Sequence, residues 1–327
     1  MTARIVLLVT SPRLPAGLLT AAAWDLVRAH PVYASAESEQ GDALRAAGVA
    51  VTVIAPEPET LIAALAEHDT LVWLAGPAGD QEFARHLGLR LAREPALAEL
   101  ELGYGSWDPP GARLLDAVAV LDRLASPGGD PWKRQQTHET LAQYLLEEAY
   151  EAYDAIVQGD LDALREELGD VLLQVVLHAR LAEELGDGER WNVDDVAGGL
   201  VDKMIRRNPH VFAGESVASV EEITENWERI KQAEKARDSV LDGIAMSQPA
   251  LSLVAKILQR TERGGFDVPL PAVSDLDPAA ALGATLLQVV AQARAAGLDA
   301  EAALRRAALD YAERVRAVER ENVGTPE

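Results

Sequence analysis

The sequence of 327 residues contains no cysteine, and only 5% of its residues are aromatic. The lack of cysteine excludes disulfides and thiolate metal sites, and it fits the reducing conditions of the cytoplasm. A low aromatic content with abundant alanine and leucine favours packed helices over β-sandwiches or barrels. An apolar share of 48% is enough to form a sizeable core. We therefore expect a mainly α-helical, folded protein.

Positive charge is also scarce, because 30 lysines and arginines face 53 aspartates and glutamates, for a net charge of −23. Such a chain repels nucleic-acid backbones and anionic membranes, so we expect neither as a partner. No apolar run approaches the roughly 20 residues that span a bilayer. The apolar stretch from Ile5 to Val9 is too short for a signal-peptide core and predicts a buried strand instead.

Residues 1–110 alternate strand-like and helix-like segments. Three short runs rich in β-branched residues, at 4–10, 49–56 and 70–76, are separated by segments with helical periodicity. This order predicts a small α/β domain with a parallel sheet, which we expect to be non-catalytic. The stretch 99–113, with two prolines and three glycines, is interpreted as its boundary, and a helix is expected at 114–124.

From Thr137 onward the pattern is almost wholly helical. Thr137 is a plausible N-cap and Gly159 a plausible helix end, but Thr140 does not offer the Glu or Gln of a capping box. Asp160 is the expected N-cap of the next helix. Further helices are predicted at 161–186, 193–208 and 219–241, and a final helical pair follows the proline-rich segment 267–278.

One segment of the chain is repeated. LGDVLLQVVLHAR begins at Leu168, and LGATLLQVVAQAR begins at Leu282, 114 residues later, with nine of thirteen positions identical. An Ala/Leu-rich composition can produce some of this similarity by chance. The differences carry more information, because the second copy has alanines (Ala280, Ala281 and Ala284) where the first has acids (Glu166, Glu167 and Asp170).

Two carboxylate pairs are the main candidate site. Glu148 with Glu151, and Glu167 with Asp170, are spaced so that each pair shares one helix face. The short link between the two helices predicts an antiparallel hairpin that brings the pairs together. Oxygen ligands without His or Cys select Mg²⁺, with Mn²⁺ as a possible substitute. The alternative is an ordinary solvated acidic face.

Positive charge close to an aromatic residue forms the second candidate group. A metal-bound triphosphate still needs Lys or Arg on its remaining oxygens, and a base can stack on an indole ring. The alternatives are a core anchor for the tryptophan and simple ion pairs for the cations. The residues are Lys203, Arg206 and Arg207 in VDKMIRRNPH, and Trp227 and Lys231 in ENWERIKQAEK.

These segments together resemble the MazG family of the all-α NTP pyrophosphatase superfamily. LLEEAYE followed by REELGDVLLQVV resembles the paired motif EExxE and ExxD, and DPWKRQQT resembles the family's CPWDxxQT segment. KMIRRNPHVF and WERIKQAEK resemble two further family segments. Asp130 and Lys133 depart from the family's usual Cys and Asp. The resemblance covers about residues 126–240.

The resemblance implies a MazG-type helical bundle that hydrolyses nucleoside triphosphates to monophosphate and pyrophosphate. It implies a catalytic domain at 111–240 and a degenerate second repeat at 241–327, after the domain at 1–110. Region 1–110 is faintly similar to tetrapyrrole methylase domains, but TSPRLPAG stands where a GxGPGD-type loop would be, so methyl transfer is not expected.

Further expectations concern single residues and the oligomeric state. Glu147 is a candidate base or partner of the first metal ligand, and a homodimer that completes the bundle is expected. Alternative functions are a phosphoribosyl-ATP or dUTP pyrophosphatase, and a catalytically silent nucleotide sensor or scaffold. The implied metal ligands are Glu148, Glu151, Glu167 and Asp170, and the implied substrate contacts are Lys203, Arg207, Trp227 and Lys231.

Overall fold

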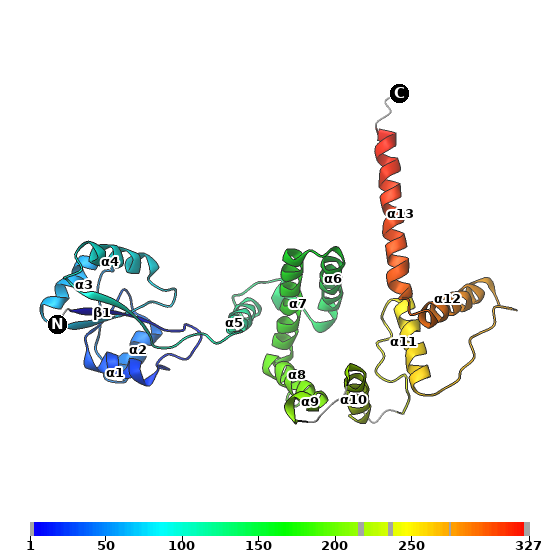
Figure 1. Cartoon of the computed structure of the whole chain (residues 1–327), viewed down its shortest axis with the longest axis horizontal. Coiled ribbons are helices and arrows are strands. Elements are labelled where there is room, and N and C mark those ends of the chain that lie inside the picture. Colours follow the sequence, from blue (N-terminus) through cyan, green and yellow to red (C-terminus); the bar gives the residue numbers. More distant parts are fainter. Residues whose placement is uncertain (1–2, 215–218, 235–237, 275, 324–327) are drawn as a thin grey trace. The chain divides into compact units, whose positions relative to one another are not determined.

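The computed structural model describes residues 3–214, 219–234, 238–274 and 276–323. Within them the chain is mainly helical with a small N-terminal sheet, as predicted (Figure 1). Its contacts form two compact units, residues 1–200 and 201–327. The finer domain limits at 110 and 240 remain predictions.

The N-terminal sheet is parallel throughout, with the strand order β3-β2-β4-β1-β5. Side chains alternate across it, so that Ile5 and Trp73 pack on one face with α3 and α4, and Leu8 and Val72 pack on the other with α1 and α2. The strands are β1 (Arg4–Val9), β2 (Val32–Ala34), β3 (Val51–Val53), β4 (Thr70–Leu74) and β5 (Glu99–Tyr104). The covering helices are α1 (Ala21–Ala29), α2 (Glu39–Ala46), α3 (Pro58–Ala63), the 3₁₀ turn η1 (Ala64–Ala66) and α4 (Gln81–Arg93).

Strand β5 corrects one prediction, since Glu99–Tyr104 was interpreted as part of a boundary segment. The strand lies at the edge of the sheet and pairs with β1, and all of its residues except Gly103 are exposed, so the run lacks the continuous apolar pattern of a buried strand. Gly103 is required where β5 meets β1, because a Cβ there would lie 2.9 Å from Cγ1 of Val6. The prolines and glycines after Tyr104 form the actual connection. Strand β2, which has three residues, was also missed.

Three helices follow the sheet within the first unit. Helix α5 (Arg113–Ala125) matches its prediction, and η2 (Lys133–Gln135) leads into α6 (His138–Gln158) and α7 (Leu161–Ala182). Helix α5 packs on α7, and Nε of Arg180 donates to Asp122 at 2.6 Å. The loop TSPRLPAG is held to α5 through Arg13, whose Nε and Nη2 bind the two carboxylate oxygens of Asp116 at 2.8 and 2.6 Å.

The remaining helices extend into the second unit. The prediction for 219–241 was too long, because α10 ends at Ala233, a turn occupies 238–243, and 235–237 lie outside the described residues. Helices α9 and α11 were not predicted, and α11 packs on α12 and α13. The helices are α8 (Val193–Arg207), α9 (Pro209–Phe212), α10 (Val220–Ala233), α11 (Ala250–Arg263), α12 (Pro278–Ala295) and α13 (Ala300–Val323).

No single helix in the described ranges is long and apolar enough to cross a membrane. Helix α12 and the part of α13 from Ala300 to Arg320 reach the length and apolar composition of a membrane span only when they are taken together, and the two are bent by 108° relative to each other.

The start of α6 contains the capping box that the sequence interpretation had rejected. The hydroxyl of Thr137 accepts from the backbone N–H of Thr140 at 3.3 Å, and the hydroxyl of Thr140 accepts from the backbone N–H of Thr137 at 2.9 Å. A threonine hydroxyl can therefore replace the usual Glu or Gln, because the box needs only an acceptor oxygen within reach.

Removal of this cap should destabilise the helix that carries the first acid pair. We expect Thr137→Ala to lower the free energy of unfolding by about 0.5–2 kcal/mol, the usual range for a lost N-cap. Thr137→Ser keeps the hydroxyl and should stay close to the wild type. Urea unfolding followed by circular dichroism measures both, and equal stability of the Ala variant and the wild type would contradict the capping role.

Candidate functional site

The candidate site is built on the hairpin of α6 and α7, which is confirmed as antiparallel. Gly159 ends α6 in a left-handed conformation with φ of 72°, and Asp160 accepts from the backbone N–H groups of Asp162 and Ala163. These two residues reverse the chain with no further connection. As a result the start of α6 meets the end of α7, where the rings of His138 and His178 stack with centroids 5.1 Å apart.

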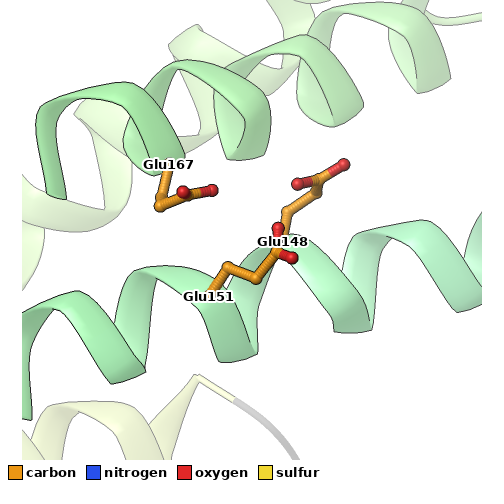
Figure 2. Close-up of side chains that lie close together, drawn as sticks. All are labelled: Glu148, Glu151 and Glu167. Atoms are coloured by element: carbon orange, nitrogen blue, oxygen red, sulfur yellow. The ribbon is translucent and has the colours of Figure 1, made fainter. Parts of the chain in front are cut away.

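Three carboxylates meet between the two helices. One oxygen each from Glu148, Glu151 and Glu167 lies within 4.8 Å of the others. Figure 2 shows Glu148 and Glu151 on one helix and Glu167 on the facing helix, with their carboxylates in the space between. Glu148 and Glu167 are partly buried, whereas Glu151 is exposed. This arrangement could hold a cation through oxygen ligands.

The pKa values of Glu148 and Glu167 are raised, in part by the neighbouring negative charges. Burial raises the pKa of Glu148 above its usual value, and the charges of Asp170 and Glu151 raise it further. Burial likewise raises the pKa of Glu167, with added contributions from Glu151 and Asp170. Asp170 is therefore within electrostatic reach of both, although it is not one of the three clustered acids. A divalent cation would remove the repulsion.

Glu147 lies next to this cluster in sequence but is solvent-exposed. Its charge also contributes to the raised pKa of Glu148. Its role as a base stays a prediction.

In the loop before α6, Asp130 accepts from the backbone N–H groups of Trp132 and Lys133 at 2.7 and 3.0 Å. Both bonds lower the pKa of Asp130, and the bond from Lys133 has the larger effect. Asp130, which stands where the family usually has Cys, therefore has a structural role in this loop.

The predicted substrate contacts lie in the second compact unit. The guanidinium carbon of Arg207, at the end of α8, lies 5.4 Å from the ring centroid of Trp227 on α10. Lys231 lies one helical turn after Trp227, and Lys203 one turn before Arg207, and both are partly buried. Trp227 is itself only partly buried, so it is not enclosed in a core.

Two features of the structure were not foreseen. His138 and His178 share a 2.7 Å contact between their Nδ1 atoms, and burial, followed by the charge of His138, lowers the pKa of His178. Glu234 binds both Arg206 and Arg207. The signal for Glu234 was present in the sequence, because this residue, at the C-terminal cap of α10, lies three residues after Lys231 and seven after Trp227.

Removal of one acid should stabilise the metal-free protein. Because the pKa of Glu148 is raised in the folded state, its carboxyl group favours folding most at a pH below the ordinary pKa of glutamate. This contribution to the free energy of unfolding is lost as the pH rises through the raised pKa. In EDTA at pH 8 we therefore expect Glu148→Gln to melt at a higher temperature than the wild type. The difference should shrink as the pH falls towards 4.

Glu139 on the same helix provides a control of opposite sign. A hydrogen bond with Thr137 lowers the pKa of Glu139, so its charge is favoured in the folded state. Glu139→Gln should therefore not raise the melting temperature at pH 8. If Glu148→Gln melts at or below the wild-type temperature in EDTA, the acids do not repel one another as described.

Comparisons with known proteins extend over much of the chain. Residues 136–212 match the MazG nucleotide pyrophosphohydrolase domain. An uncharacterised 26.1 kDa protein of Streptomyces cacaoi is 45% identical over 68% of this chain and 89% of its own length. A nucleoside triphosphate pyrophosphohydrolase of Mycobacterium tuberculosis is 44% identical over 64% of this chain, which spans 59% of that relative.

A further relative, from Thermotoga maritima, carries the family name. This nucleoside triphosphate pyrophosphohydrolase/pyrophosphatase MazG is 36% identical over 62% of this chain and 84% of its own length. The match includes most of the relative, and the matched domain contains both acid pairs. The chain belongs to the MazG family of nucleotide pyrophosphohydrolases.

Proposed function

We propose that this protein hydrolyses nucleoside or deoxynucleoside triphosphates to monophosphate and pyrophosphate, and so removes unwanted nucleotides from the cellular pool. The observation that carries this proposal is the meeting of Glu148, Glu151 and Glu167 between two helices of the matched domain. The names of the mycobacterial and Thermotoga relatives describe the same class of reaction.

The cofactor in this proposal is Mg²⁺, and the acids fit it. Carboxylate oxygens are the ligands that Mg²⁺ prefers, and one oxygen each from Glu148, Glu151 and Glu167 lies within 4.8 Å of the others. Glu148, Glu151, Glu167 and Asp170 would hold the ion, and Mn²⁺ could replace it. When bound, the cation neutralises phosphate charge and polarises water.

The chain's own residues supply the remaining functions. Glu147 accepts a proton from the attacking water, or holds a neighbouring ligand in place. Lys203, Arg207 and Lys231 bind phosphate oxygens through charged hydrogen bonds. Trp227 offers an indole face to the base. Water adds across the bond between the α- and β-phosphates, so that one product keeps the bridging oxygen and the other takes the oxygen of water, and the products are nucleoside monophosphate and pyrophosphate.

The proposed setting follows from this substrate. Nucleoside triphosphates are found in the cytoplasm, where we place the protein. At a net charge of −23, it gains no attraction to nucleic acid or to an anionic membrane surface, and neither is a proposed partner.

Isosteric removal of ligand charge tests the metal site. Glu151→Gln and Asp170→Asn should each reduce the rate of Mg²⁺-dependent pyrophosphate release. The reduction should exceed the ~10–100-fold that is typical when a residue hydrogen-bonded to a metal ligand is lost, because these residues are the proposed ligands themselves. The helical circular dichroism spectrum should be unchanged. Glu183→Gln, on the same hairpin but paired with Arg180 at 3.8 Å, should retain activity.

Near-normal turnover by either ligand variant would place the site elsewhere. A wild-type protein that binds nucleoside triphosphate but releases no pyrophosphate with Mg²⁺ would favour the sensor or scaffold alternative.

A second copy of the chain is the proposed partner. Leu146, Tyr150, Tyr153 and Val157 recur at helical spacing along α6, and each is at least 38% exposed. An exposed apolar stripe on one helix face is unfavourable in water unless it is covered. A homodimer would cover it and complete a bundle around the acids.

Charged residues in this stripe should prevent dimer formation. We expect the double variant Leu146→Glu and Val157→Glu to sediment as a monomer, while the wild type sediments as a dimer. Leu89→Glu is a matched control, because Leu89 is a leucine of α4 that is 52% exposed and lies outside the stripe. A wild-type monomer, or a double variant that still dimerises, would contradict the proposed interface.

A further inference from the structure

Glu234 binds two consecutive arginines at the junction of α8 and α10. Nε of Arg206 donates to Oε1 of Glu234 at 2.7 Å, and Nη2 of Arg207 donates to Oε2 at 2.5 Å. Nε of Arg207 lies 3.2 and 3.1 Å from the two oxygens. The Arg207 and Glu234 side chains are only 10% and 14% exposed, whereas Arg206 is 54% exposed. The inner pair is thus held in a largely enclosed position.

The edge of the guanidinium that Glu234 uses is informative. An arginine can bind a carboxylate or phosphate in a bidentate manner through its Nε–Nη2 edge or through its Nη1–Nη2 edge. Glu234 occupies the Nε–Nη2 edge of Arg207. Among the residues that the structure describes, the hydrogen bonds of Arg207 all come from Nε and Nη2, and Nη1 belongs to the second edge.

The surroundings favour an anion at this second edge. The guanidinium carbon of Arg207 lies over the ring of Trp227, 5.4 Å from the ring centroid. Two arginines share one glutamate, so the group keeps one net positive charge. The carboxylate stays ionised throughout the neutral range, because the hydrogen bonds from Arg207 and then Arg206 lower the pKa of Glu234 to about 2.

We propose that Glu234 is a positioning residue that holds the Nε–Nη2 edge of Arg207 against Trp227 and presents the opposite edge to a phosphate group of the substrate. The inference rests on the proposed function, in which Arg207 binds phosphate. Glu234 does not touch the substrate and acts only through Arg207. The loss of Glu234 therefore leaves a charged but misoriented arginine.

The test uses the full-length protein with Mg²⁺ and a nucleoside triphosphate. Glu234→Ala should raise KM by about tenfold, the effect of one weakened charged hydrogen bond, with a smaller change in kcat. Glu234→Gln keeps one acceptor oxygen and should show a smaller increase in KM. Arg207→Ala should raise KM at least as much as Glu234→Ala.

A double-mutant cycle separates positioning from general stabilisation. If Glu234 acts through Arg207, adding Glu234→Ala to Arg207→Ala should change KM no further. Multiplication of the two effects, or an unchanged KM in Glu234→Ala, would overturn the inference. Glu262→Ala is the control, because Glu262 pairs with Arg294 in the same unit and should leave kcat and KM unchanged.

Two further outcomes are distinguishable. A wild-type protein that releases no pyrophosphate would refute the proposed function itself rather than the role of Glu234. If Glu234→Ala does not fold, as judged by circular dichroism, the same cycle with Glu234→Gln decides, since it changes only the charge and one acceptor atom.

Discussion

The crowding of carboxylates between α6 and α7 is the constraint on which the other features of the site depend. Glu148 and Glu151 face Glu167 across a hairpin whose turn consists of a left-handed glycine and one capping aspartate. Burial and mutual repulsion raise the pKa of two of these acids. A chain that keeps such a cluster gives up some stability in its metal-free state, which is the usual signature of a functional site.

The acid hairpin could be predicted because its geometry is local. Spacing of three residues defines a helix face, and a two-residue link leaves one arrangement of the helices. Other features depend on distant contacts or on uncommon local chemistry. Strand β5 forms by pairing with β1, in a register that places Glu99 opposite Arg4, ninety-five residues earlier in the chain. The ion pair between Arg207 and Glu234 joins two helices that no spacing rule connects.

The two copies of the repeated segment differ in their acids, because only the first copy carries carboxylates, at Glu166, Glu167 and Asp170. Both copies lie on helices, α7 and α12, yet their partners differ. Helix α7 follows α6 after two residues, whereas α12 is separated from α11 by the long segment 264–277. Ala284, at the position of Asp170, is buried at 6% exposure. An acid there would be costly without a cation, which fits the alanine at this position.

The acids between α6 and α7 are proposed to bind a divalent cation. Titration of the full-length protein with Mn²⁺, followed by electron paramagnetic resonance, measures this directly and without turnover. We expect saturable Mn²⁺ binding near neutral pH, which Mg²⁺ should displace and which the double variant Glu148→Gln and Glu167→Gln should lose. Equal Mn²⁺ binding by the double variant and the wild type would contradict this proposal.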